Sequence, residues 1–203
     1  MYILNVSDLP VMSVNCQIII QNKQATIQDL DENCSTIIEH KIQNFFNFTK
    51  YNKEVSLKID DFILECLKTS KFIKFDNKII NFDNSIEYEY ESGEILEVNT
   101  QKDSEICGIV LPSRTFIDED YTVKICINDN KLIIDDDCGT KYRLETIHCS
   151  KLKESQEQYF NSEFIMKVLK QNLNTFCKVH MKKDFPICFE FTNKRIFIAP
   201  LSI

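Results

Sequence analysis

The stretch "DFILECLK" (residues 61–68) decides the fold, because a similar stretch, "EFIMKVLK" (163–170), returns in the second half of the chain. In both, apolar residues recur at spacings of three and four, which is typical of an amphipathic helix. Asp60 stands where the first helix would begin, and Asn161 or Ser162 where the second would be capped. The sequence therefore predicts two similar helices, one in each half of the chain.

A second pair of similar segments lies upstream of these helices. "CQIIIQNKQATIQDLD" (16–31) and "VKICINDNKLIIDDD" (123–137) each consist of two β-rich runs around a polar turn, which predicts a hairpin. Two matching pairs at nearly the same offset argue for an internal duplication. We therefore expect two tandem domains, 1–92 and 106–203, joined by a polar connector at 93–105.

Most of the remaining sequence has the composition of β-strands. "STIIEHKIQNFFNF" (35–48) continues as strand, and "KFIKFDNKIINFDNSIEYEY" (71–90) predicts two or three more strands with turns at 76–77 and 83–84. The last residues of this segment alternate tyrosine or isoleucine with glutamate, as a half-exposed strand does. The expected fold class is α+β, mostly β.

The charge balance excludes one broad class of function. The chain has 203 residues, of which 43% are hydrophobic and 27% charged, as in an ordinary globular protein, and its net charge is -7. A protein that bound nucleic acid through its whole surface would be basic. Any contact with DNA would therefore depend on a local patch of lysines.

The cysteines and the apolar end of the chain indicate its environment. None of the nine cysteines forms a C-x-x-C pair and their number is odd, so we expect buried thiols in a reducing compartment. No apolar run approaches the roughly 18 residues of a membrane span, and no signal peptide or membrane contact is expected. The apolar end "KRIFIAPLSI" (194–203) is therefore too short for a membrane anchor, which leaves a buried strand end or a docking surface.

Two acidic stretches resemble calcium-binding loops at first sight. An EF-hand loop needs glycine at its sixth position and glutamate at its twelfth. "DLDENC" (29–34) and "DDDCG" (135–139) begin loops that have neither residue there, so we reject both. The histidines His40, His148 and His180 also lack metal-ligand spacing. We expect no metal, no cofactor and no enzymatic activity.

Two C-terminal segments carry a resemblance to a known family. "MKKDFPICFEF" (181–191) matches a Met-x-x-Asp-x-Pro strand pair that ends in Glu-aromatic, and "FIAPLSI" (197–203) matches a terminal aromatic-aliphatic-Ala-Pro segment. "ATIQDLDENCSTI" (25–37) and "LPSRTF" (111–116) add weaker matches in the same order along the chain. Together they resemble the sliding clamps of the PCNA superfamily over nearly the whole chain.

The chain also departs from the clamp pattern. A clamp domain has two helices, but 5–15 and 112–122 have room for only a turn or two where the first should lie, and Pro10 interrupts the earlier stretch. The resemblance therefore implies two tandem sliding-clamp (DNA-clamp) domains with shortened or missing first helices. "QNFFNFTKYNKEVSLKIDDFILECL" (43–67) is about equally similar to the diverged subunits of the heterotrimeric checkpoint clamp, the Rad nine-one-one ring.

The resemblance implies a function on DNA without sequence readout. Clamp subunits form a ring around double-stranded DNA, act as processivity factors for DNA polymerases, tether repair proteins by short docking motifs, and depend on a separate clamp loader. For this chain it implies a homo- or heterotrimer in the nucleus. Helices would line the bore, which places four lysines near the DNA backbone: Lys68, Lys71, Lys167 and Lys170.

The resemblance also implies two protein-binding surfaces. Partner peptides would dock into an apolar pocket formed by Leu30, Leu96, Val98, Pro186, Phe197, Ala199 and Pro200. Subunits would join by pairing the acidic edge strand 85–91 with the edge strand 141–147, which carries Lys141 and Arg143. The predicted interface residues are Tyr88, Tyr90, Tyr142 and Leu144.

Two alternatives stay open on the sequence. The chain could be a checkpoint-clamp subunit of a heterotrimer in the response to DNA damage. It could also be an interaction scaffold that kept the clamp fold and no longer encircles DNA. The second alternative is favoured by the acidic residues Asp60, Asp61, Glu65 and Glu163, which weaken the positive field of the two helices.

Overall fold

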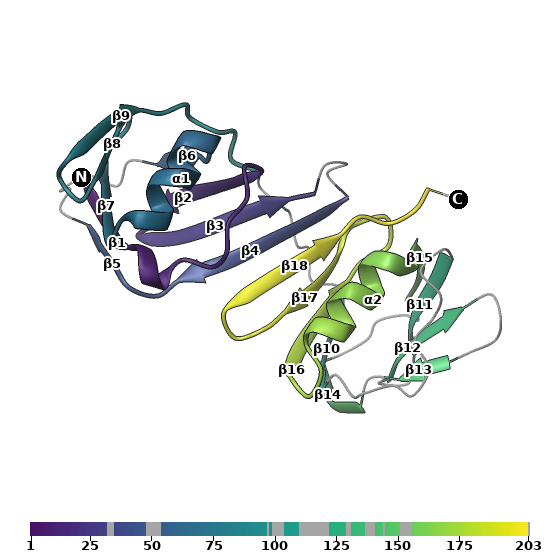
Figure 1. Ribbon diagram of the computed structural model, residues 1–203. Coiled ribbons are helices and arrows are strands. Elements are labelled where there is room, and N and C mark those ends of the chain that lie inside the picture. The colour runs from purple at the N-terminus through teal and green to yellow at the C-terminus, as the bar shows by residue number, and fades with distance from the viewer. Residues whose placement is uncertain are drawn as a thin grey trace. The chain divides into compact units, whose positions relative to one another are not determined.

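The computed structural model describes residues 1–31, 35–47, 54–96, 98, 104–109, 122–128, 131–136, 141–143, 145–150 and 156–202. The chain divides into two compact units, Met1–Glu97 and Val98–Ile203. Among the described residues, each unit consists of antiparallel strands and one α-helix (Figure 1). The division falls inside the stretch 93–105 that the sequence indicates as a connector.

The first unit contains strands β1 to β9, a 3-10 helix η1 and the α-helix α1. Their bounds are β1 Tyr2–Asn5, η1 Val6–Asp8, β2 Cys16–Gln21, β3 Gln24–Leu30, β4 Thr36–Ile42, β5 Phe45–Asn47, β6 Val55–Lys58, α1 Asp61–Thr69, β7 Phe72–Phe75, β8 Ile79–Phe82 and β9 Ile86–Glu89. The strands are hydrogen-bonded in the orders β5-β1-β7-β8-β9 and β4-β3-β2-β6.

The second unit repeats the order of strands and α-helix of the first. Its bounds are β10 Ser104–Ile109, β11 Thr122–Asn128, β12 Lys131–Asp136, β13 Lys141–Arg143, β14 Glu145–Ser150, β15 Gln156–Asn161, α2 Ser162–Gln171, β16 Phe176–Met181, β17 Ile187–Glu190 and β18 Lys194–Ile198. Its strand orders are β14-β10-β16-β17-β18 and β13-β12-β11-β15. Each order is that of the first unit with every strand replaced by its counterpart, so the duplication extends to the whole topology.

Two turns with left-handed backbone fix the strand pairing of the first unit. Asn22 and Lys23 connect β2 to β3 with φ angles of 51° and 63°. Positive φ at both residues of a two-residue loop is the type I′ geometry, whose twist matches that of an antiparallel hairpin. After β8, Asp83 and Asn84 have φ angles of 48° and 60°. The Asp83 carboxylate accepts the Phe72 N–H at 2.9 Å, which ties this turn to the start of β7.

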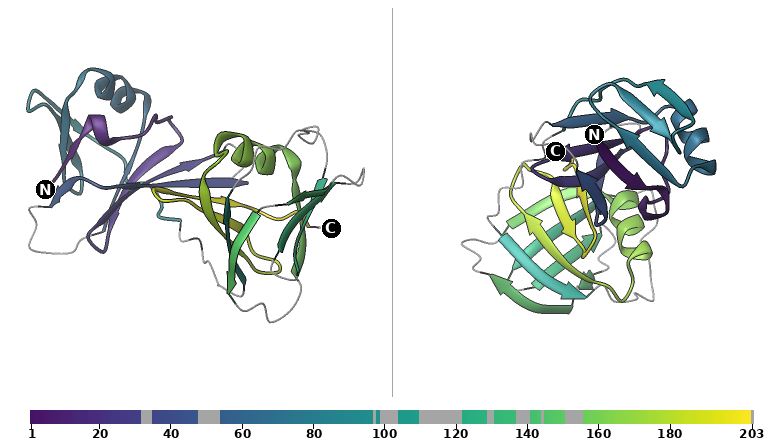
Figure 2. Two further views of the ribbon diagram at one scale, coloured as in Figure 1. Left: turned by 90° about the horizontal axis from the view of Figure 1, so that it is seen from below. Right: turned by 90° about the vertical axis from the view of Figure 1, so that its left-hand side faces the viewer.

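Both helices begin where the sequence predicts, and each buries most of its apolar face, although Phe62 of α1 is 44% exposed. Asp60 Oδ1 accepts the Ile63 N–H at 2.8 Å, and Asn161 Oδ1 accepts the Glu163 N–H at 2.9 Å. Figure 2 shows each helix lying against strands of its own unit. The buried hydrophobic residues are Ile63, Cys66 and Leu67 in α1 and Ile165, Met166, Val168 and Leu169 in α2.

The core of the first unit unites both of its strand groups with α1. Ile18 and Ile27, which are paired on β2 and β3, lie in one cluster with Phe75 of β7 and Ile63 of α1. All four side chains are fully buried, at 1% exposure or less. Burial of this apolar surface is the main favourable term for folding of the unit.

The predicted shortening of the first helix is confirmed in the first unit, where the chain between β1 and β2 forms the three-residue helix η1. The corresponding stretch of the second unit, 112–122, lies outside the described residues except for Thr122, as does "LPSRTF" (111–116). In the part of the chain that the structure describes, neither α-helix has the length and hydropathy that crossing a bilayer requires.

Four of the cysteines are buried as the sequence predicts, namely Cys16, Cys66, Cys177 and Cys188. Burial raises the pKa of the Cys16 and Cys66 thiols, which keeps both neutral at physiological pH. They therefore act as small apolar side chains. Cys34 and Cys138 lie outside the described residues.

Asp60 links the start of α1 to β9, because its Oδ2 also accepts the Tyr88 hydroxyl at 2.7 Å. Asp60→Ala removes the cap and this hydrogen bond, so we expect the free energy of unfolding to fall by about 2 kcal/mol. Urea unfolding measures the change. The matched control is Asp61→Ala, which removes an exposed carboxylate one residue later and should cost less than about 1 kcal/mol. Equal losses in both variants would contradict this role of Asp60.

Candidate functional site

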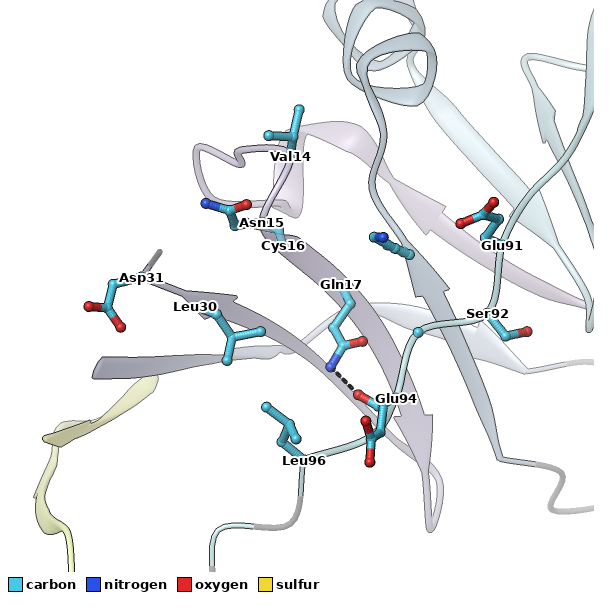
Figure 3. Close-up of a pocket in the computed structure, with 12 residues that line it drawn as sticks. Val14, Asn15, Cys16, Gln17, Leu30, Asp31, Glu91, Ser92, Glu94 and Leu96 are labelled. Atoms are coloured by element: carbon cyan, nitrogen blue, oxygen red, sulfur yellow. Dashed lines mark hydrogen bonds between the residues drawn. The ribbon is translucent and has the colours of Figure 1, made fainter. Parts of the chain in front are cut away.

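A cavity of about 510 Å³ opens at the strand ends of the first unit (Figure 3). One wall is formed by residues 14–17 at the start of β2, residues 30–31 at the end of β3, and Lys58 at the end of β6. The opposite wall is formed by residues 91–94 and Leu96, in the chain that follows β9. Every lining residue belongs to the first unit.

A row of polar side chains crosses the strands next to the cavity. Gln28 Nε2 donates to Glu39 Oε1 at 3.0 Å, Gln17 Nε2 donates to Gln28 Oε1 at 2.9 Å, and Ser56 Oγ donates to Gln17 Oε1 at 3.1 Å. We call Glu39, Gln28, Gln17 and Ser56 the amide row. All four are buried, with Gln28 only 3% and Gln17 only 5% exposed. Partners of this kind are required, because an unpaired buried amide costs about 1–3 kcal/mol.

The amide row also holds residues 93–96, which we call the strap. Gln17 Nε2 donates a second hydrogen bond to the Glu94 carbonyl at 2.8 Å, drawn in Figure 3, and Gln28 Nε2 donates one to the Leu96 carbonyl at 2.8 Å. The Gly93 N–H donates to the Ser56 carbonyl at 3.3 Å. The strap therefore crosses β6, β2 and β3 in turn, with alternate carbonyls directed at the sheet.

Gly93 is required by the close approach of the strap to the amide row. A Cβ atom at this position would lie 2.1 Å from Gln17 Oε1 and 3.1 Å from Ser56 Oγ. Gln17 Oε1 accepts the Ser56 hydroxyl, so the glutamine cannot move aside without breaking the row. A larger residue at position 93 would instead lift the strap from the sheet.

The cavity combines apolar side chains with an acidic rim. Figure 3 shows Leu30 and Leu96 near one another, and both line the cavity. The charged lining residues are Asp31, Glu91, Glu94 and Lys58, so carboxylates outnumber the ammonium group. Within the described ranges, no three His, Cys, Asp or Glu side chains lie close enough to hold a metal ion. The arrangement suits a short apolar segment that also carries positive charge.

The structure brings together two of the predicted pocket residues, Leu30 and Leu96, in this cavity. The other predicted pocket residues lie in the second unit. There Val98, Pro186 and Pro200 are half-buried and Ala199 is exposed. Phe197 requires a correction, because it is only 2% exposed and lies opposite Cys188 in the β17–β18 pair. Its side chain belongs to the core and does not form an open pocket wall.

The predicted DNA-facing lysines are all exposed, on or next to the helices. The exposed charges of α2 are Glu163, Lys167 and Lys170. Those of α1 are Asp61, Glu65 and Lys68, and Lys68 forms an ion pair with Glu65. Lys71 follows the end of α1. The exposed face of α2 is therefore net positive and that of α1 net negative.

The strands predicted to join subunits lie at the ends of strand orders. β9 ends the order of its group in the first unit, and β13 ends one in the second, so each leaves one side unpaired among the described strands. Tyr142 lies in β13, and Leu144 lies outside the described residues. An unpaired strand side is a surface on which another chain can add a strand.

Tyr90 requires a correction as an interface residue, whereas Tyr88 is half-buried and stays a predicted one. The Tyr90 side chain is only 6% exposed, and its hydroxyl donates to the Asp76 carbonyl. Tyr88 donates to Asp60 and stacks on Phe62 at a ring distance of 4.5 Å. The hydrogen bond to Asp60 raises the pKa of Tyr88, so its hydroxyl stays protonated and continues to donate. Both tyrosines have hydrogen-bond partners within their own unit, and β9 also presents the exposed residues Glu87 and Glu89.

Sequence reasoning missed the amide row. The signal that could have found Gln17 and Gln28 is their position in the hairpin, because a two-residue turn at 22–23 places them directly opposite one another. Adjacent glutamines on one face of a strand pair can form a hydrogen-bonded row. The partners of this row on the strap are main-chain carbonyls, which the sequence does not mark.

Gly93→Ala should loosen the strap through the contact with Gln17. We expect the free energy of unfolding to fall by about 1–2 kcal/mol, because hydrogen bonds between the strap and the row are lost. Thermal and urea unfolding measure the change. Ser92→Ala, at the exposed neighbouring residue, is the control and should change stability by less than about 0.5 kcal/mol. A Gly93→Ala variant as stable as the unaltered chain would show that the strap tolerates a side chain here.

Comparisons with known proteins were made for sequence and for fold. No protein-family model matches the chain, and no curated protein matches its sequence. In fold, the chain is similar to the crystal structure of the PCNA2-PCNA3 complex from Sulfolobus tokodaii, with a TM-score of 0.56 and 14% sequence identity over 91% of this chain and 89% of that chain. The tandem repeat of one topology agrees with this similarity. The chain therefore has the two-domain, PCNA-like fold of a sliding clamp.

Proposed function

We propose that the chain is a non-enzymatic ring subunit that encircles DNA and tethers replication or repair proteins to it. The observation that carries the proposal is the clamp fold, built from two units of the same topology. In such a ring, topological linkage replaces tight binding. A protein with a net charge of -7 can then work on DNA through a small number of local contacts.

Ring closure would use the free sides of β9 and β13. β9 carries the exposed carboxylates Glu87 and Glu89, and the sequence of β13 carries Lys141 and Arg143. Opposite charge on the two strands favours head-to-tail pairing of β9 in one subunit with β13 in the next. A head-to-tail contact closes into a ring when the rotation between subunits allows it.

The partners in the ring would be other clamp subunits. The similar solved structure is described as a complex of PCNA2 with PCNA3, and this supports clamp subunits as partners of the present chain. A homotrimer and a heterotrimer, including a checkpoint clamp, both fit the proposal. Assembly on closed DNA would need a clamp loader, because a ring has to open before DNA can enter it.

DNA contact would fall mainly on α2. Its exposed face is net positive through Lys167 and Lys170, whereas the exposed face of α1 is net negative. Lysines on a helix face bind phosphates without reading bases, which is what movement along DNA requires. Unequal helices would make one half of each subunit the principal DNA contact.

Docked proteins would insert a short segment into the cavity of the first unit. Leu30 and Leu96 offer apolar contacts, and the carboxylates of Asp31, Glu91 and Glu94 favour basic residues beside the apolar plug. A cavity of about 510 Å³ is large enough for one or two side chains of such a segment. The preferred occupant is therefore an apolar peptide flanked by lysine or arginine.

One observation favours a second candidate function, a clamp-fold scaffold that does not encircle DNA. On α1, Lys68 is already paired with Glu65, and Asp61 adds a further negative charge. An acidic helix facing the DNA would oppose encirclement. The two candidates share the docking cavity and differ in assembly and DNA binding.

Assembly should depend on the charges of β9 and β13. The double variant Glu87→Lys with Glu89→Lys places positive charges on both strands. We therefore expect the apparent dissociation constant of the trimer to rise at least tenfold. Light scattering over a concentration series measures the mass, alone and with partner subunits. Combining it with Lys141→Glu and Arg143→Glu restores opposite charges and should restore assembly. A monomer at every concentration, with and without clamp subunits, would contradict the ring.

DNA binding should depend on α2. Lys167→Glu with Lys170→Glu should reduce retention on nicked circular DNA by at least tenfold and lower its salt dependence, because phosphate contacts are lost. The control is Lys183→Glu, an exposed lysine of the second unit outside the helix. Retention of all variants at the level of the unaltered chain would contradict the DNA-facing assignment of α2.

A further inference from the structure

We propose that Gln17 and Gln28 are positioning residues for the docking cavity, because their amides latch the strap onto the sheet and thereby place Leu96 beside Leu30. The proposal rests on the docking role proposed above. It adds to that role the groups that determine the shape of the cavity. These groups are the side-chain amides of two buried glutamines, with main-chain carbonyls as their partners.

The direction of the amide row is set at one end. A Glu39 carboxylate can only accept hydrogen bonds, so Gln28 must turn its NH₂ group toward it. The carbonyl oxygen of Gln28 is then left to accept from Gln17 Nε2. Each NH₂ group therefore uses one hydrogen in the row and has the other to donate to the strap. The row thus presents donors, and the strap must present carbonyls.

The hydrogen bonds of Gln17 and Gln28 to the strap, which we call the latch, are linked to the cavity through β3. Gln28 holds the Leu96 carbonyl at 2.8 Å, and Leu30 lies two residues further along the same strand. Side chains two residues apart on a strand point to the same side. The separation of Leu30 and Leu96 is therefore fixed through Gln28, and release of the strap would remove the wall that Leu96 and Glu94 provide.

The second unit offers an internal comparison. The residues that correspond in hairpin register to Gln28, Gln17 and Ser56 are Asp135, Lys124 and Glu157. Lys124 forms an ion pair with Glu157 at 2.9 Å, and their side chains are 33% and 60% exposed. At these positions of the second unit the side chains are charged and more exposed, whereas Gln17 and Gln28 of the first unit are neutral and buried. Neutral amides at these positions are therefore not a general requirement of the fold.

Hydrogen exchange tests the latch without any partner. Gln28→Met and Gln17→Met keep the side-chain length and remove the donors, so exchange of the Gly93 amide, which donates to the Ser56 carbonyl, should accelerate about tenfold while exchange in α1 stays unchanged. Gln17→Met leaves the bond between Gln28 and Glu39 intact, which protects the test if Gln28→Met folds poorly. The control is Gln21→Met. Gln21 lies on the same strand as Gln17, and its replacement removes a hydrogen bond to Glu54 and should leave the strap unchanged.

A fluorescein-labelled peptide with a short run of leucines flanked by lysines tests the positioning role. We expect Gln17→Met and Gln28→Met to weaken its binding about tenfold, and Gln21→Met to leave it unchanged. Unaltered exchange in the strap would overturn the latch. Faster exchange with unaltered peptide affinity would overturn the positioning role. Failure of the peptide to bind the unaltered chain would contradict the docking function and with it the positioning role, while the exchange result would still decide the latch.

Discussion

The first unit depends on the register of the β2–β3 hairpin. Its two-residue turn places Ile18 opposite Ile27 on the core side and Gln17 opposite Gln28 on the other side. A shift of one residue would exchange the two faces, burying amides in the core and exposing the isoleucines. The same register therefore determines the core, the amide row, the path of the strap and the wall of the cavity.

The duplicated topology explains how one chain can carry different surfaces. Both units use the same succession of strands and a helix, so both have a helix face and free strand sides. The two units differ in the side chains that matching elements carry. α2 is the more positive helix, β9 is acidic, and the glutamine pair of the first unit corresponds to charged residues in the second. Fold supplies the positions, and the residues placed on them decide what each position binds.

Most of the fold could be predicted from the sequence because its signals are local. Helix spacing, the caps Asp60 and Asn161, and the alternating strands each depend on residues near one another. The errors arose where the position of a residue in the fold determines whether its side chain is buried or exposed. Phe197 was predicted to be a pocket residue but is buried, and Tyr90 was predicted to be an interface residue but is buried within its own unit. The amide row was missed because its partners are carbonyls far along the chain.

The most direct test of the central claim is a covalently closed ring on DNA. A photo-crosslinking amino acid in place of Glu89 on β9 would join neighbouring subunits, and the joined ring would then be denatured in the presence of circular or linear DNA. Encirclement predicts that crosslinked protein stays with circular DNA under denaturing conditions and is released when the DNA is cut. Release from circular DNA despite complete crosslinking of the subunits would contradict the account.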